Sequence, residues 1–284
     1  MKLTRTVQEV KDQVREWKKQ GLSVGLVPTM GYLHEGHQSL IKRAVAENDR
    51  VVVSVFVNPI QFAPNEDLET YPRDLEADCT LCESTGAAMV FHPEPSEMYH
   101  DDFTTFVDMT GVTKELCGKS RPTHFRGVCT VVNKLFNIVT PDKAYFGQKD
   151  AQQLAVIRRM VRDLNMNVEV VGCPIIREAD GLAKSSRNTL LTDEERAIAP
   201  TIYKALKDSL KYAKTHTVKE THDKVVNDIN SVDGLDVEYF SIVDGNTLQD
   251  VQDWEDSPYV VGCITVYCGK TPIRLIDHIK YKES

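Results

Sequence analysis

The stretch "LSVGLVPTMGYLHEGHQSLIKRAVAEND", residues 22–49, holds a strand, a turn and a helix in direct succession. Its first part, "LSVGLVP" at 22–28, is a short apolar run typical of a buried strand. Its last part starts near Gly36 and repeats apolar residues at helical spacing, with one face formed by Leu40, Ile41, Ala44 and Val45. The segment "PTMGYLHEGH" at 28–37 is therefore the turn where a strand passes into a helix.

The same alternation continues along the chain. "RVVVSVFVNP" at 50–59 is almost entirely apolar and β-branched, as in a strand buried on both faces of a parallel sheet. Periodic segments predict helices at 7–21, about 72–86, 127–142 and 151–165, and strands at 87–93, 143–148 and 168–178. Repeated β-α-β order predicts an α/β fold with a doubly wound, Rossmann-like parallel sheet. Such sheets bind ligands beyond the carboxyl ends of their strands, so the strand-to-helix turns are the segments to inspect.

The character of the sequence changes near residue 177. The polar loop "DGLAKSSRN" at 180–188 is followed by Thr192 and Glu195, which form a capping box for a new helix. Helices are expected at about 193–214 and 217–229, and strands at 235–243, 259–269 and 272–281. We therefore expect a Rossmann-like domain at 1–177 and a smaller α+β domain at 178–284 that carries the polar loop at its start.

Composition narrows the class of protein. The chain has 284 residues, 41% of them apolar and 27% charged, and a formal net charge of -8. A general nucleic-acid-binding surface is not expected at that charge, so an anionic ligand would need a local cluster of donors. The N-terminus lacks the apolar core of a signal peptide, and no apolar run is long enough to span a membrane. Seven scattered cysteines favour a reducing cytoplasm over a disulfide framework.

The turn at 28–37 has the chemistry of a phosphate site. Gly31 and Gly36 let the backbone approach a ligand, and a helix that starts near Gly36 directs free N–H groups at it. His34 and His37 add donors, which suits a triphosphate. A zinc site is disfavoured because the metalloprotease pattern needs histidines four apart, whereas these are three apart. Histidines of the core or surface are the remaining alternative.

Two further segments have donors suited to phosphate. "FGQKDAQQ" at 146–153 is another strand-to-helix turn, with Gly147 for close approach, Lys149 for an anion and Asp150 for ribose hydroxyls or a helix cap. "KSSRN" at 184–188 offers a lysine, two hydroxyls and an arginine. The alternatives are a solvated helix start and a polar linker, respectively. After the strand at 50–59, Gln61 in "NPIQF" is placed to bind a small polar substrate.

Two other motifs are interpreted as structural. "CTLC" at 79–82 falls within a predicted helix without further ligands nearby, which favours two cysteines that pack the helix. "GKS" at 118–120 is not a P-loop, because the motif needs a glycine at the position of Thr113. Lys119 and Arg121 remain candidates to face an anion.

Several stretches together resemble the pantoate–β-alanine ligase family. They are "PTMGYLHEGH", "VSVFVNPIQF", "YPRDLEAD", "HFRGVCTVVNKLFNIVTPDKAYFGQKDAQQL" and "READGLAKSSRN". The likeness is specific over residues 24–192 and looser beyond. It implies a cytoplasmic enzyme that uses ATP and pantoate to make pantoyl adenylate and pyrophosphate. β-Alanine then attacks the adenylate to give pantothenate and AMP. It also implies Mg²⁺ carried with the phosphates, with unknown metal ligands, and a homodimer.

The resemblance also implies roles for individual residues. Those near the reacting phosphates are His34, His37 and Lys149. The ATP site would comprise Met30, Gly31, Tyr32, Leu33, His34, Glu35, Gly36, His37, Gly147, Gln148, Lys149, Asp150, Ile176, Lys184, Ser185, Ser186 and Arg187. Gln61 and Gln153 would hold pantoate, and Gln61 would also lie near β-alanine.

Three positions depart from the family pattern. Lys184 stands where many relatives have methionine, and its added charge is expected to tighten phosphate binding. Thr123 replaces a glycine and is expected to shift its turn. His278 replaces an asparagine, far from the chemistry. Two other functions are considered: a different H-x-G-H nucleotidyltransferase, which leaves the nucleotide on its product, and a non-catalytic nucleotide-binding module.

Overall fold

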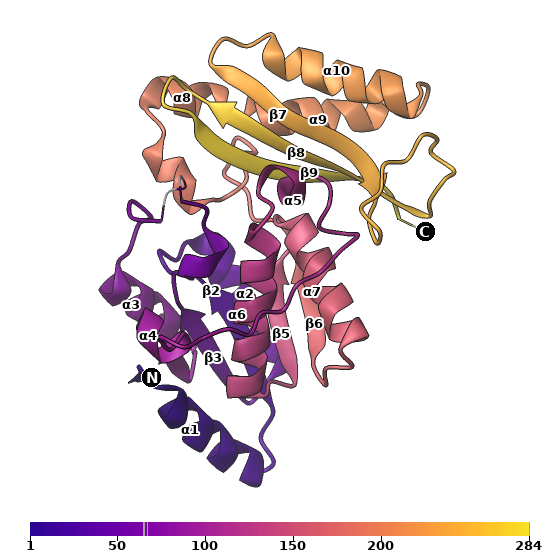
Figure 1. Ribbon diagram of the computed structural model, residues 1–284. Coiled ribbons are helices and arrows are strands. Elements are labelled where there is room, and N and C mark those ends of the chain that lie inside the picture. Colours follow the sequence, from indigo (N-terminus) through magenta and orange to yellow (C-terminus); the bar gives the residue numbers. More distant parts are fainter. Residues whose placement is uncertain (65, 67, 284) are drawn as a thin grey trace.

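In the part of the chain that the structure describes, the strands form two separate β-sheets, one parallel and one antiparallel (Figure 1). The computed structural model describes residues 1–64, 66 and 68–283. Within that part of the chain the first sheet has six parallel strands in the order β1-β4-β3-β2-β5-β6. The strands are β1 Lys2–Thr4, β2 Val24–Thr29, β3 Arg50–Val55, β4 Met89–Phe91, β5 Lys143–Gly147 and β6 Glu169–Cys173.

Helices cover both faces of the parallel sheet, because alternate strand residues face opposite layers. Leu26 and Val52 share a core with α1, α6 and α7, whereas Val27 and Val53 share one with α2 and α3. The helices span α1 Val7–Lys19, α2 Glu35–Glu47, α3 Leu75–Thr85, α6 His124–Val139 and α7 Ala151–Asp163. The predicted doubly wound fold is confirmed. Strand order reverses between β2 and β5, and the crevice for ligands lies at that point.

The second sheet is antiparallel, in the order β7-β8-β9 among the residues described. In Figure 1 it lies above the parallel sheet, with α9 and α10 against its outer face. The bounds are α8 Asp193–Ile198, α9 Thr201–Tyr212, α10 Val218–Asn230, β7 Leu235–Asp244, β8 Tyr259–Cys268 and β9 Ile273–Glu283. Leu206, Ile229 and Ile264 are among the side chains buried between the helices and this sheet.

The single helix expected at 193–214 is wrong. The predicted capping box of Thr192 and Glu195 is present and starts α8, but α8 ends at Ile198 and α9 starts at Thr201. Pro200 causes the break, because it has no N–H to donate to the preceding turn and instead occupies the N-cap of α9.

Some elements are too short to show a sequence period. Strand β1 pairs with β4 at the sheet edge, where the sequence predicts no strand. The other short elements are α4 Pro95–Met98, α5 Cys117–Ser120, and the 3₁₀ turns η1 Pro59–Gln61 and η2 Ser186–Leu190. Among the described residues, no helix is both long and apolar enough to cross a membrane.

Candidate functional site

The turn after β2 leads directly into the N-terminus of α2. His34 is the N-cap, and the Gly36 N–H donates to its Nδ1 at 3.0 Å. The His34 N–H donates in turn to Nδ1 of His37 at 3.2 Å. Gly36 is required here, because a Cβ at that position would lie 2.7 Å from the His34 ring. The local sequence therefore places both imidazoles at the positive end of a helix.

These two hydrogen bonds determine the tautomer of both rings. A neutral imidazole that accepts at Nδ1 carries its proton on Nε2. Burial, followed by the charges of Lys149 and Lys184, lowers the pKa of His34 to about 4. Burial, with the charge of Lys149, holds the pKa of His37 well below its ordinary value. Both histidines are therefore neutral near pH 7, and each has an Nε2–H to donate.

The turn itself is held by a buried carboxylate that the sequence prediction missed. Gly31 has φ +87°, and Tyr32 has φ 52°. Asp78 of α3 accepts from the Tyr32 N–H at 2.9 Å and from the Leu33 N–H at 2.6 Å. Burial raises the pKa of Asp78. This aspartate connects α3 to the turn and stabilises its left-handed backbone.

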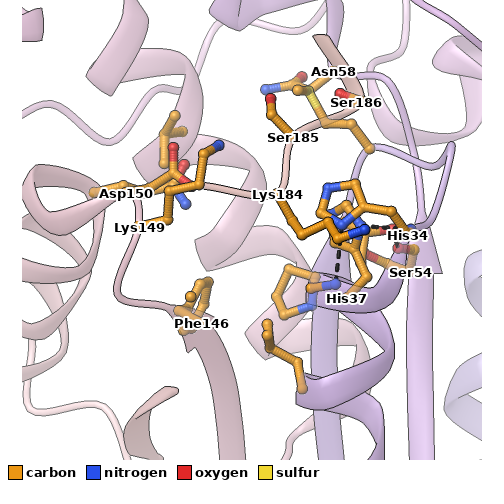
Figure 2. Close-up of a pocket in the computed structure, with 18 of the residues that line it drawn as sticks. His34, His37, Ser54, Asn58, Phe146, Lys149, Asp150, Lys184, Ser185 and Ser186 are labelled. Carbon is orange, nitrogen blue, oxygen red and sulfur yellow. Dashed lines mark hydrogen bonds between the residues drawn. The ribbon is translucent and has the colours of Figure 1, made fainter. Parts of the chain in front are cut away.

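A cavity of about 220 Å³ opens at the carboxyl ends of β2, β3, β5 and β6. Figure 2 shows His34 and His37 on one side and Lys149 and Asp150 on the other. One part of its wall is apolar and consists of Leu40, Phe56, Val128, Val131, Val132, Leu135 and Phe146. The cavity can therefore hold a polyanion between opposed donors, with an aliphatic group against the apolar wall.

Most of the predicted site residues line this one cavity. They are Met30, His34, Gly36, His37, Gln61, Gly147, Lys149, Asp150, Gln153, Ile176, Lys184, Ser185, Ser186 and Arg187. The carboxyl ends of four strands and the 184–187 segment thus meet at one cavity. The turns at 28–37 and 146–153 both contribute to its wall.

Five predicted residues lie outside the cavity lining. Gly31 lies behind it, and the backbone N–H groups of Tyr32 and Leu33 are bound to Asp78. Glu35 is exposed and forms an ion pair with Lys184. The backbone N–H of Gln148 donates to Cys173 O, and its side chain lines a separate hollow beside α7. The prediction included every residue of the segments 30–37 and 147–150, whereas only some residues of each segment line the cavity.

A family model described as pantoate-beta-alanine ligase matches residues 2–280. The chain belongs to the pantoate–β-alanine ligase family. A pantothenate synthetase from Enterococcus faecalis is 56% identical over 285 residues, covering 99% of each chain. One from Ruminiclostridium cellulolyticum is 57% identical with the same coverage.

Solved structures of the ligase family share the fold. Pantothenate synthetase from Thermus thermophilus superposes with a TM-score of 0.93 at 44% identity, covering 99% of this chain and 100% of that one. Pantoate-beta-alanine ligase from Francisella tularensis, complexed with beta-gamma ATP and beta-alanine, gives 0.81 at 34% identity, covering 99% and 98%. These chains extend the likeness over both sheets.

Lys184, one of the departures from the ligase pattern, is not a free cation. Its ammonium lies 2.7 Å from Glu178 and also pairs with Glu35 at the start of α2. The hydrogen bond that it donates to Glu178 raises its pKa. The charge that this position adds is therefore met by two carboxylates at the edge of the cavity.

The other two departures also differ from expectation. Thr123 has φ -95°, in the ordinary right-handed region, so a side chain is accommodated without strain in its turn. His278 is closer to the chemistry than predicted. It lines a second cavity, of about 510 Å³, that is also lined by Lys149, Asp150 and Gln153. That cavity lies between the parallel sheet and β9. His278 and Asp150 are far apart in the sequence, so the sequence did not indicate that they share a cavity.

Asn58 and Ser54 also line the cavity and were missed. Both lie at or just past the carboxyl end of β3, the position from which Gln61 was predicted to bind a ligand. Asn58 belongs to the same "NPIQF" segment. The apolar residues of α6 in the wall were assigned to the helix but not to the site.

The two motifs interpreted as structural behave accordingly. Cys82 is fully buried in the core behind β3 and β4, and Cys79 packs against the same core, as predicted. Arg121 forms a close ion pair with Glu66, and Lys119 pairs with Glu115. Neither cation lines the first cavity, although Arg121 lines the second.

Proposed function

We propose that the first cavity performs the reaction of its family, the ATP-dependent condensation of pantoate with β-alanine to pantothenate. The observation that carries the proposal is the pair of Nε2–H donors at the N-terminus of α2, facing Lys149 across an apolar-walled cavity. This arrangement suits a nucleoside triphosphate beside a small aliphatic acid. Family membership over nearly the whole chain supports the same assignment.

In the first step, a pantoate carboxylate oxygen bonds to the α-phosphorus of ATP. The bond from that phosphorus to the bridging oxygen breaks, and pyrophosphate leaves with the electron pair. Negative charge builds on the phosphoryl oxygens and on the leaving group. The Nε2–H groups of His34 and His37 and the ammonium of Lys149 would stabilise that charge without moving. One preorganised donor in such a site is worth on the order of 3 kcal/mol.

In the second step, the β-alanine amine attacks the acyl carbon of the pantoyl adenylate. The acyl–oxygen bond breaks, AMP leaves, and the amine loses a proton. No nucleophilic side chain is required in either step. Exclusion of water protects the mixed anhydride, which supports a closing role for the 184–187 segment.

The two glutamines would hold the organic substrates. Gln61 and Gln153 line the cavity together with the apolar residues of α6. Pantoate carries two methyl groups, a carboxylate and two hydroxyls, so it needs an apolar surface with a few polar donors beside it. Gln61 would also contact β-alanine.

The remaining wall would bind ATP. The 147–150 turn, Ile176 and the 184–187 segment would contact the nucleotide, with Asp150 suited to the ribose hydroxyls. Mg²⁺ would enter with the phosphates. Among the described residues no three His, Cys, Asp or Glu side chains form a metal cluster, and Mg²⁺ is ordinarily held by phosphates with one or two carboxylates.

We also propose three properties of the whole protein. A domain boundary near residue 177 is supported because the parallel strands precede it and the antiparallel strands follow it. A cytoplasmic location is supported by seven free thiols. A homodimer is supported by the family resemblance, and light scattering coupled to gel filtration tests it.

The test of function is pantoate-dependent exchange of labelled pyrophosphate into ATP, followed by pantothenate formation when β-alanine is added. We expect both. Exchange with another acid or alcohol but not with pantoate would instead favour a different nucleotidyltransferase. ATP binding without any turnover would favour a non-catalytic module.

His37→Ala tests the donor role directly. We expect loss of exchange by at least about a hundredfold, as for one lost oxyanion-type donor, with an unchanged circular dichroism spectrum. His100→Ala, at an exposed position away from the cavity, is the matched control and should exchange like the wild type. Near-wild-type exchange in His37→Ala would contradict the role.

A further inference from the structure

Behind Gln61 lies a chain of buried side-chain hydrogen bonds. The Tyr99 hydroxyl donates to Asn58 Oδ1 at 2.7 Å. Asn58 Nδ2 donates at 3.1 Å to Gln61 Oε1 and at 3.1 Å to the carbonyl oxygen of Gly127. Asn58 is 1% exposed, and it lines the cavity that Figure 2 shows. Tyr99 follows α4 and is not among the residues that line the cavity.

The polarity of this chain has one consistent direction. The Gly127 carbonyl only accepts, so the Asn58 amide must present Nδ2 to it. Both hydrogens of Nδ2 are then used, and Oδ1 is left to accept from Tyr99. Gln61 must therefore present Oε1 to Asn58. Its Nε2 is directed to Met30 Sδ, at 3.0 Å, on the cavity wall.

We propose that Tyr99 is a positioning residue that, together with the Gly127 carbonyl, holds Asn58 so that Gln61 is a hydrogen-bond donor to the acid substrate. The proposal rests on the proposed function, in which Gln61 holds pantoate. Thioether sulfur is a weak acceptor, so a carboxylate or hydroxyl oxygen replaces it readily as the partner of Nε2. Tyr99 touches no substrate in this scheme. It acts by satisfying Asn58 Oδ1, which burial would otherwise leave without a partner.

The ring of Tyr99 is held independently of its hydroxyl. Its centroid lies 5.0 Å from that of Phe103 and 6.3 Å from that of Phe56, and the Lys134 ammonium lies 5.5 Å from it. Burial raises the pKa of Tyr99, so the hydroxyl keeps its proton. The backbone of Gln61 is held as well, because α6 packs against it so closely that a Cβ on Gly127 would lie 2.5 Å from Gln61 Cα. Tyr99→Phe therefore removes one donor and little else.

The first experiment is pyrophosphate exchange with Tyr99→Phe. We expect the KM for pantoate to rise about three- to tenfold, the range for one lost hydrogen bond, while the KM for ATP changes less than about twofold. Tyr145→Phe is the control. Tyr145 is fully buried, and its hydroxyl is bonded to Asn48 and Glu47 away from the cavity. An unchanged KM for pantoate, or an equal rise for both substrates, would overturn the proposal.

Two further measurements separate positioning from general loosening. In a Gln61→Ala background, Tyr99→Phe should have no additional effect on the KM for pantoate, whereas an undiminished effect would overturn the proposal. The Gln61 side-chain amide signals in nitrogen-15 NMR test the hydrogen-bond relay from Tyr99 through Asn58 to Gln61, and they do so without turnover. They should shift in Tyr99→Phe and not in Tyr145→Phe, and unchanged signals would overturn it. If the wild type lacks pantoate-dependent exchange but these signals shift, the proposed function fails and the relay stands.

Discussion

At the level of single residues, the site depends on two histidines that are kept neutral by where they lie. Each accepts a backbone N–H at Nδ1, so Nε2 becomes the donor. A protonated imidazole would bind phosphate more strongly in water, but burial and the Lys149 charge across the cavity disfavour a second positive charge. In the proposed reaction the helix N-terminus and Lys149 would supply the charge, and the histidines would supply directed hydrogen bonds.

Neutral buried histidines make stability depend on pH. The pKa of His34 lies at about 4 in the folded state, against an ordinary 6.5. Burial also lowers the pKa of His124 to about 4. Between pH 6.5 and about pH 4 the folded state binds fewer protons than the unfolded chain. The free energy of unfolding therefore falls as the pH drops below 6.5. The contribution is complete above that pH.

Urea denaturation between about pH 7 and about pH 5 measures this loss. His34→Asn should flatten the pH dependence relative to the wild type, because the variant has no imidazole to titrate at this position. His100→Ala, which removes an exposed imidazole away from the cavity, is the matched control. Parallel curves for His34→Asn and the wild type would contradict the assignment.

Lys184 offers a prediction about charge at the edge of the cavity. Lys184→Met would leave Glu35 and Glu178 without their cation, beside the proposed phosphates. We expect the KM for ATP to rise by about two- to fivefold at low salt and by less at high salt, because the pairs are partly exposed and screened. Glu35→Gln should lower that KM. Steady-state kinetics at two ionic strengths tests both, and changes of the same sign would contradict the prediction.

At the level of secondary-structure elements, α3 takes part in the site without contacting the cavity. Its Asp78 holds the turn between β2 and α2 through two backbone N–H groups. The turn contains two left-handed residues, Gly31 and Tyr32, which would relax without this support. Packing of α3 against α2 thus determines where the histidines lie.

Asp78→Ala should therefore affect both stability and nucleotide binding. Two partly buried N–H groups lose their acceptor, which costs about 1–3 kcal/mol in the free energy of unfolding and raises the KM for ATP. Urea denaturation and exchange kinetics measure the two effects. Asp256→Ala is the matched control, since Asp256 also accepts from two backbone N–H groups but is exposed and remote. A variant that loses stability with an unchanged KM for ATP would separate α3 from the site.

At the level of the whole molecule, an ion pair joins the segment that follows the parallel sheet to a strand of the antiparallel sheet. Arg177 donates to both carboxylate oxygens of Asp277 on β9, at 2.6 and 2.9 Å. It also donates to Gly181 O, within the hairpin that Arg177 and Ala183 close. The second sheet therefore anchors the hairpin from which residues 184–187 extend into the cavity.

Asp277→Asn should test this anchor. Asp277 is 5% exposed, so its loss as an anion leaves the Arg177 charge uncompensated at a cost of about 3–5 kcal/mol in the free energy of unfolding. We also expect a higher KM for ATP. Asp228→Asn, at a partly exposed pair with Lys224, should cost about 1 kcal/mol or less. Denaturation and kinetics that show equal effects at the two positions would contradict the anchor.

The fold was predictable because its signals are local. The β-branched run at 50–55 indicates a strand, and the position of 28–37 between two periodic segments indicates a turn. The helix predicted over 193–214 is divided into α8 and α9, because Pro200 has no N–H to donate to the preceding turn. Strand β1 was missed because three residues carry no period; it forms only because β4 offers a partner edge.

The order of residues alone was enough to specify the parallel-sheet architecture, the histidine turn and the donor residues, because periodicity and turn chemistry act over neighbouring positions. Tertiary packing was needed to establish that Asp78 supports the turn, that Tyr99 and Asn58 lie behind Gln61, that Lys184 is paired, and that His278 and Asp150 line the same cavity. These relations join residues of different elements. Their physical basis is the packing of one element on another, which places buried polar groups where each must find a partner.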